Sequence, residues 1–156
     1  MKFKIIPLFV MSVYMLISQS SYATELDDYL IQKNLIGQDY KIIDQQNLDD
    51  VLTALSEEDS RVLPVQVDQN TVIEKIHMYH DHVDLQGLIT SKDFNQFSNS
   101  MGKEKTQQLL MEGMLENCHL LFENEFQRQN PYYVKIKLMS EQKAYELKLK
   151  NEQCKF

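Results

Sequence analysis

The residues best suited to chemistry are histidines, three of which lie within six positions in the segment IHMYHDHVD, residues 76–84. On a β-strand, side chains two positions apart share a face and lie about 6.5 to 7 Å apart. His80 and His82 are therefore expected side by side, with Asp84 next in the row, and such a row could bind a transition metal ion. His77 falls on the opposite face, so only two histidines converge. A zinc site usually needs three or four protein ligands. We favour a polar strand that ends in solvent, and the metal site stays open as the alternative.

No other group of residues in the sequence predicts catalysis. Cys118 and His119 are adjacent, but neighbouring side chains on a helix diverge by about 100° and do not form a thiol–base pair. The chain has four glycines and contains no GxSxG, HExxH, CxxC or glycine-rich phosphate loop. The acidic cluster Glu57–Asp59 is typical of a solvated helix end. We therefore expect a protein that is not an enzyme and that holds no cofactor.

Residues 1–23 have the layout of a secretory signal peptide. Lys2 and Lys4 precede an uncharged apolar run over residues 5–17, and small or polar residues lead to Ala23. The run is too short to cross a hydrocarbon core, which needs about 20 apolar residues. No cysteine near Ala23 could accept a lipid. The mature chain is expected in the periplasm or outside the cell, without a stable membrane anchor.

The charge balance excludes one class of partner. The whole chain has 16 basic and 23 acidic residues, a net charge of −7. Without residues 1–23, which contain Lys2 and Lys4, the balance is 14 basic against 23 acidic residues, or −9. Because an acidic surface repels phosphate backbones, nucleic-acid binding is not expected.

Two short helices are expected near the start of the mature chain. Glu25–Leu35 has apolar residues at helical spacing and acids in its first turn, and Gly37 follows as a stop. Asn47–Asp59 has an apolar stripe, two acids near its start and Asn47 as its predicted cap.

The histidines are expected on one long strand. The segment RVLPVQVDQNT, residues 61–71, contains Pro64, which predicts an extended entry segment rather than a helix or a central strand. Thr71–Leu85 then begins with β-branched residues and continues in alternation, which predicts a single strand. A short helix around Phe94 and Phe97 is expected after it.

The main amphipathic helix is predicted over Lys103–Gln127 and is ended by Pro131. Its apolar residues recur at steps of three and four and are Leu109, Leu110, Met114, Leu115, Cys118, Leu121, Phe122 and Phe126.

The C-terminal segment alternates, which predicts a β-hairpin with one buried and one solvent-facing side. The buried side would contain Tyr132, Val134, Ile136 and Leu138, followed by Tyr145, Leu147 and Leu149. It needs a cover, and the main helix has the largest apolar stripe. The predicted class is α+β: a long amphipathic helix on a small antiparallel sheet that ends in this hairpin, preceded by two short helices. We expect an N-terminal helical segment over 24–61 and an α+β core domain over 62–156.

The two cysteines of the chain, Cys118 and Cys154, predict one disulfide, because an even pair in an exported protein is normally oxidised. Cys118 lies on the apolar stripe of the main helix and Cys154 just beyond the last strand. A bridge between them would hold the helix on the sheet and close a loop that is worth roughly 3 to 4 kcal/mol.

Several of these marks occur together in a known group of proteins. Leu63-Pro64 with Asp68 downstream, a helix with one cysteine, the strand NPYYVKIKL and a closing cysteine resemble small exported disulfide-containing α+β proteins of Gram-negative bacteria. The group includes candidate virulence factors regulated by quorum sensing. The resemblance covers residues 62–156, and the turn Ser140–Lys143 departs from it because it lacks an Asp/Gly pair. It implies an exported module with a role in virulence or the envelope, and it implies no catalytic residue.

These observations favour a protein-binding module with an unidentified protein partner. Eight methionines and eight tyrosines suit protein interfaces, although core filling explains the methionines as well. The predicted contact surface is the solvent-facing side of the hairpin around Tyr133, Lys135 and Lys137. The alternative is a metal-binding or metal-dependent periplasmic protein that uses His80 and His82.

Overall fold

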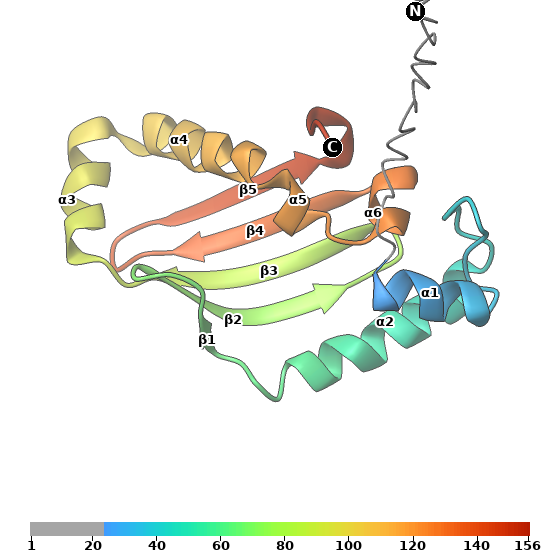
Figure 1. Ribbon diagram of the computed structural model, residues 1–156. Coiled ribbons are helices and arrows are strands. Elements are labelled where there is room, and N and C mark those ends of the chain that lie inside the picture. The colour runs from blue at the N-terminus through green and yellow to red at the C-terminus, as the bar shows by residue number, and fades with distance from the viewer. Residues whose placement is uncertain (1–23) are drawn as a thin grey trace, which may run out of the picture.

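The computed structural model describes residues 24–156, so the predicted signal peptide lies outside the described residues. These residues form an α+β fold, as predicted (Figure 1). The elements are α1 (Glu25–Gln32), α2 (Gln45–Asp59), β1 (Val65–Gln66), β2 (Thr71–Met78), β3 (His82–Ile89), α3 (Lys92–Met101), α4 (Lys103–Glu116), α5 (Cys118–Leu121), α6 (Glu125–Gln129), β4 (Tyr133–Met139), β5 (Ala144–Lys150) and a 3₁₀ turn (Asn151–Gln153).

The sheet has five strands in the order β1-β2-β3-β4-β5. Neighbouring strands are antiparallel except for β3 and β4, which run parallel with His82 opposite Tyr133. The parallel pair arises because the chain leaves β3, passes through helices α3 to α6 and returns to the same end of the sheet, which a parallel connection requires. The predicted small antiparallel sheet is therefore a mostly antiparallel one with a single helical crossover.

The predicted single strand Thr71–Leu85 is wrong, because the chain turns back at residues 79–81 and forms the hairpin β2–β3. The Tyr79 N–H donates to the His82 carbonyl at 2.8 Å. The turn contains no glycine, proline or asparagine that would reveal it in the sequence. Instead, Asp49 of α2 accepts hydrogen bonds from the backbone N–H of His80 at 2.7 Å, so a distant residue satisfies the turn.

The helix predicted over Lys103–Gln127 is divided into α4, α5 and α6. Asn117 ends α4, and its side-chain amide donates to the Gly113 carbonyl at 2.8 Å. Asn124 then starts α6, where its backbone N–H donates to the Gln127 side chain at 2.9 Å. The apolar periodicity continues across both breaks, so it does not reveal them.

The two N-terminal helices form near their predicted positions with different ends. The cap of α2 is Asp44 rather than Asn47, whose backbone N–H donates to the Asp44 carboxylate at 3.1 Å. Helix α1 ends at Gln32 because Asn34 has a positive φ of 57°, a conformation that asparagine tolerates better than most residues.

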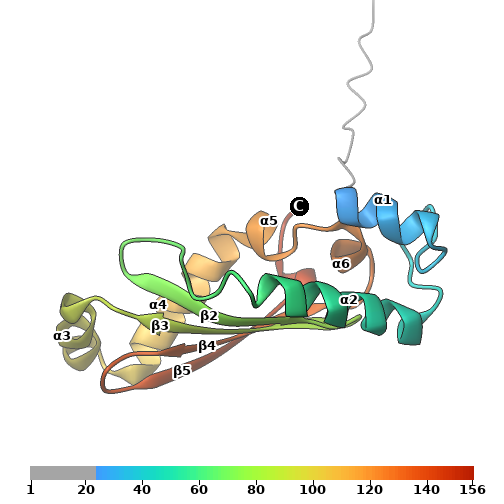
Figure 2. The ribbon, with the colours of Figure 1, turned by 90° about the horizontal axis from the view of Figure 1, so that it is seen from below.

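The helices lie on one face of the sheet, which we call the inner face (Figures 1 and 2). Figure 2 shows α5, α6 and α1 above the strands, whereas α3 lies beside the end of the sheet at the left of the view. Helix α2 runs beside β2, where the Ser56 hydroxyl accepts the Met78 N–H at 2.8 Å and donates to the Leu52 carbonyl at 2.8 Å. It therefore covers a strand edge that would otherwise be open to pairing.

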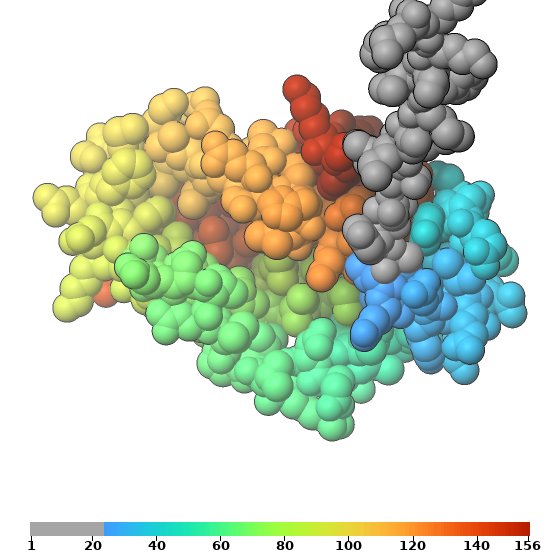
Figure 3. Space-filling model, viewed as in Figure 1, coloured from blue at the N-terminus to red at the C-terminus, as the bar shows by residue number. Residues whose placement is uncertain are grey.

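The core lies between the inner face and these helices, and the space-filling view in Figure 3 shows the helices covering much of that side. The alternation predicted for the C-terminal hairpin is confirmed: Val134 and Leu149 are buried, whereas Lys135 and Lys137 are exposed. Buried residues from both 24–61 and 62–156 contribute to one cluster, which includes Leu30, Leu48, Leu52, Phe122, Phe126, Val134, Leu147 and Leu149.

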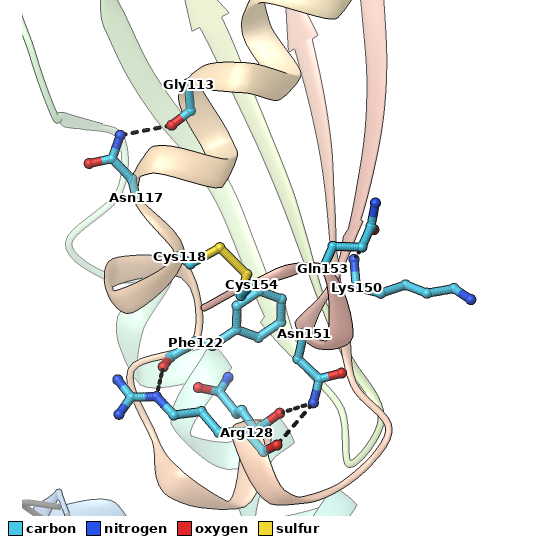
Figure 4. Close-up of a disulfide and its surroundings, with 10 residues drawn as sticks. Gly113, Asn117, Cys118, Phe122, Arg128, Lys150, Asn151, Gln153 and Cys154 are labelled. Atoms are coloured by element: carbon cyan, nitrogen blue, oxygen red, sulfur yellow. Dashed lines mark hydrogen bonds between the residues drawn. A yellow bond between two sulfur atoms is a disulfide. The ribbon is translucent and has the colours of Figure 1, made fainter. Parts of the chain in front are cut away.

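The predicted disulfide between Cys118 and Cys154 is confirmed, with 5.8 Å between the Cα atoms (Figure 4). It joins α5 to the chain just beyond β5. Nearby, the Asn151 side-chain amide donates to the carbonyls of Gln127 at 2.8 Å and Asn130 at 2.6 Å. The C-terminal end of the sheet is therefore held to the α5–α6 segment by one covalent bond and by a single asparagine.

Candidate protein-binding surfaces

The inner face is left partly uncovered over β2 and β3, between α2 on one side and α5 with α6 on the other. One depression of about 400 Å³ is lined by Leu26, Tyr29, Leu55 and Met78, together with the acids Glu25 and Asp59. A second of about 130 Å³ also reaches Met78 and is lined by Ile76, Leu85, Leu120, Leu121 and Glu123, among others. We call the two together the inner groove. In Figure 3, yellow-green strand residues are visible at the bottom of the hollow between the orange helices and α2.

The inner groove exposes large apolar side chains that belong to helices. Leu120 of α5 is 67% exposed and Tyr29 of α1 is 42% exposed. The charged residues that line the groove, Glu25, Asp59 and Glu123, are all acidic. The groove therefore combines an apolar floor with negatively charged sides.

The walls of the inner groove are fixed by a buried carboxylate. Asp27 of α1 is fully buried and accepts the N–H groups of Glu125 at 2.8 Å and Phe126 at 3.1 Å, which are the first residues of α6. A carboxylate is favourable at a helix N-terminus, where N–H groups lack helical partners. Thr24 adds a hydrogen bond to the Asn124 side chain at 2.5 Å. Helices α1 and α6, which each contribute residues to the inner groove, are thus held together.

The opposite side of the sheet, which we call the outer face, carries a row of neighbouring rings at one end. The ring centroids of His77 and Tyr79 are 4.4 Å apart, those of Tyr79 and His82 are 4.3 Å apart, and those of His82 and Tyr133 are 4.8 Å apart. The ammonium of Lys148 lies 3.6 Å from the Tyr133 ring centroid, which is a cation–π contact. We call these residues the ring row. The rings of Tyr79 and His82, in the middle of the row, each contact a ring on either side. The ring row therefore covers one end of the outer face, which has no helix over it.

The ring row perturbs the neighbouring acids and phenols. Burial raises the pKa of Asp81, but the hydrogen bond and charge of His82 outweigh it, so the pKa lies below its usual value. Burial raises the pKa of Tyr133, and the charges of Asp81 and Asp84 add to this effect. The surroundings of the ring row therefore favour the ionised form of the Asp81 carboxylate and the neutral form of the Tyr133 phenol.

The residues of the predicted metal site are separated by the hairpin turn. His80 lies in the turn, and its Nδ1 is 2.7 Å from the Asp49 carboxylate of α2. His82 lies on β3, with Nδ1 2.6 Å from Asp81 and Nε2 3.9 Å from Asp84. His80 and His82 do not share a strand face, so the geometry assumed from the sequence is wrong. Within residues 24–156, no three His, Cys, Asp or Glu side chains lie close enough together to hold one metal ion.

The predicted contact residues Lys135 and Lys137 line a depression in the outer face, and Tyr133 lies beside it in the ring row. The depression has a volume of about 350 Å³, and we call it the outer groove. The residues that line it include Lys75, His77, Asp84, Gln86, Lys135, Lys137 and Glu146. Asp84 also has a buried Oδ1 atom with no hydrogen-bond partner among the described residues.

The sequence predicted a contact surface on the outer face and none on the inner face. The residues of the outer face alternate along single strands, which the sequence reveals. The inner groove exists because α2 and α5 lie apart in the fold, and these helices are distant in sequence. The isolated apolar pair Leu120–Leu121, just after Cys118, was the available signal. Residues 24–156, the part of the chain that the structure describes, contain no helix that is long and apolar enough to span a membrane.

Comparisons with known proteins show only distant likenesses. No protein-family model matches the chain, and no curated protein does. The pilotin EpsS of the type 2 secretion system of Vibrio vulnificus matches 72% of this chain and 96% of its own, at 13% identity and a TM-score of 0.49. A candidate secreted protein of Pseudomonas aeruginosa matches 71% of this chain and 96% of its own, at 9% identity and a TM-score of 0.44. Both similar structures come from Gram-negative bacteria.

Proposed function

We propose that this protein is an exported, non-enzymatic module that binds another protein through the inner groove. The observation that carries the proposal is the exposed apolar surface between α2 and α5, with Leu120 67% exposed above strand residues of the core. Fully burying a side chain of this size stabilises a complex by about 1.5 to 3 kcal/mol. An apolar groove that the fold itself leaves open is typical of a binding site.

The shape and charge of the groove favour an amphipathic helix as the occupant. A helix laid between α2 and α5 would complete the helical layer over β2 and β3 and bury its apolar side against Met78 and Leu85. Basic residues at the edges of that helix would face Glu25, Asp59 and Glu123. We therefore propose a partner segment with apolar residues at helical spacing and lysine or arginine beside them.

Export is part of the same proposal. A disulfide within the fold suits an oxidising compartment, and the layout of residues 1–23 predicts secretion. The partner would then be a protein of the envelope, a secreted protein or a host protein. A role in virulence stays a prediction from the family resemblance.

Site-specific photo-crosslinking in the producing cells tests the inner groove. A photoreactive phenylalanine analogue is placed at Leu120, and the matched control is Ile43, which is 66% exposed and outside the groove. We expect an adduct of one discrete mass at position 120 and none at position 43. A second probe at Tyr29 should lose its adduct in a Leu120→Asp variant, because the carboxylate would face the same partner segment. Equal adducts at 120 and 43, or no adduct at 120, would refute the groove as the binding site.

A further inference from the structure

The outer face carries a charge opposite to that of the protein as a whole. The strand register places Lys75, Lys135, Lys137, Lys148 and Lys150 on this face, with Asp84 and Glu146 as the carboxylates among the paired positions. The chain itself has a net charge of −7. A locally basic surface on an acidic protein selects a negatively charged partner and orients it during approach.

Three of these lysines are available to a partner. Lys148 contacts the Tyr133 ring and Lys150 pairs with Glu152 at 3.1 Å. Among residues 24–156, Lys75, Lys135 and Lys137 have no carboxylate within 4.0 Å. All three are exposed and line the outer groove. The groove therefore offers three ammonium groups without a carboxylate partner in the fold.

The outer groove also contains hydrogen-bonding groups beside the lysines. The buried Oδ1 of Asp84 accepts no hydrogen bond in the described part of the chain, and its ion-pair contact with Nε2 of His82 is long, at 3.9 Å. Gln86 adds an amide, which can both donate and accept. A polyphosphate or a sulfated glycan would bring negative groups against Asp84 and Glu146. A polypeptide instead supplies N–H donors together with its carboxylates.

From these observations we propose that the outer groove binds an acidic, extended segment of a polypeptide. Lys135 and Lys137 point from the same face of β4, so their Cα atoms lie about 6.4 to 6.8 Å apart along the strand. An extended peptide has the same spacing between alternate side chains. Acidic residues at positions i and i+2 would therefore meet Lys135 and Lys137, and backbone or side-chain N–H groups between them would approach Asp84. The site is separate from the inner groove and does not depend on it.

Synthetic peptides test this proposal. One probe peptide has glutamate at alternate positions with threonine between them, and its isomer has the same residues with all glutamates in one block. We expect fluorescence polarisation to show saturable binding of the alternating peptide, at least fivefold tighter than that of the isomer and weaker in high salt. Pentasodium tripolyphosphate is the competitor for a simple anion site. Displacement of the peptide by tripolyphosphate at equal charge concentration would overturn the polypeptide assignment, as would the absence of saturable peptide binding.

A matched pair of charge reversals locates the site. Lys135→Glu with Lys137→Glu should weaken binding of the alternating peptide at least tenfold. Lys103→Glu with Lys105→Glu is the control, since these exposed lysines on α4 are also two positions apart and their reversal changes the net charge equally. The control should change binding less than threefold, and an equal loss in both variants would refute a specific outer site. Leu120→Asp should leave peptide binding unchanged, which distinguishes failure of this site from failure of the inner groove.

Discussion

The two faces of one sheet differ in how completely the fold covers them. The inner face is apolar and the described helices α1 to α6 lie over or beside it, yet it stays open between α2 and α5. The outer face has no described helix and is covered at one end by its own ring row. An apolar face needs a cover and a polar face does not, so the opening on the inner side is the feature that the fold alone does not explain. Uncovered surface therefore has to be interpreted differently on the two faces. Exposed apolar surface on the inner face indicates that a partner covers it. Exposed polar surface on the outer face indicates a binding site only where it contains unpaired charges.

The largest effect is expected where the helices are joined to the inner face. Cys154→Ser removes the bridge to Cys118 and opens a loop of 36 residues. The free energy of unfolding should fall by about 3 to 4 kcal/mol, because the unfolded chain gains conformational freedom. Urea denaturation followed by circular dichroism measures this change, and reduction of the native protein should reproduce it. If the Cys154→Ser variant unfolded at the same urea concentration as the native protein, the bridge would not hold the two layers together.

A smaller loss is expected from the carboxylate that joins the walls of the inner groove. Asp27→Asn replaces the anion that accepts the N–H groups of Glu125 and Phe126 with an amide that has one acceptor oxygen. We expect a loss of about 2 to 3 kcal/mol, because hydrogen bonds to a charged group are strong and a buried N–H is left without a partner. Asp28→Asn is the control, since Asp28 is an exposed acid on the same helix. Equal unfolding curves for the two variants would contradict this account of the groove walls.

Tyr132 joins the inner core to the β2–β3 hairpin, and we predict that it makes the stability depend on pH. Its ring is buried in the inner core, and its hydroxyl donates to the carbonyls of Tyr79 at 2.8 Å and His82 at 3.0 Å in the β2–β3 hairpin. Burial raises the pKa of Tyr132 far above its ordinary value, and the charges of Asp81 and Asp49 add to the effect. The stabilisation is complete below the pKa of the unfolded state, about 10, and is lost as the pH rises above it, because the unfolded chain ionises first.

Tyr132→Phe should therefore have two measurable consequences. At pH 7 it should lower the free energy of unfolding by about 1 to 2 kcal/mol, because the hydroxyl hydrogen bonds are lost. Between pH 9 and 11 its stability should fall less steeply than that of the native protein, because one phenol no longer ionises. Urea unfolding at pH 7, 9, 10 and 11 measures both effects. Parallel pH profiles for the two proteins would show that Tyr132 does not carry the alkaline instability.

The sequence predicted the parts of the fold that depend on local alternation. Tyr132 to Leu149 forms the expected hairpin, since one side of it is buried and the other solvated, and the bridge between Cys118 and Cys154 follows from their places beside it. The turn at His80 was missed because its N–H is satisfied by Asp49, which is 31 residues away. The break at Asn117 was missed because apolar spacing continues through it. The inner groove was missed for a related reason: an absent cover has no periodicity of its own.

The smallest change in stability is expected when metal ions are added, and it tests the histidines at the end of the outer face. His80 is directed to Asp49 and His82 to Asp81, so the two imidazoles serve separate carboxylates instead of converging on one point. Zinc binding at His82 and Asp84 would also have to separate His82 from two stacked rings, those of Tyr79 and Tyr133. We expect equimolar zinc to change the melting temperature by less than about 1 °C, since a ligand shifts stability only when it binds the native state tightly. Untagged protein purified from the producing cells should contain substoichiometric zinc, copper and nickel by elemental analysis. One equivalent of bound metal that disappears in a folded His80→Ala/His82→Ala variant would instead establish the metal site, and it would show that the ring row rearranges to form it.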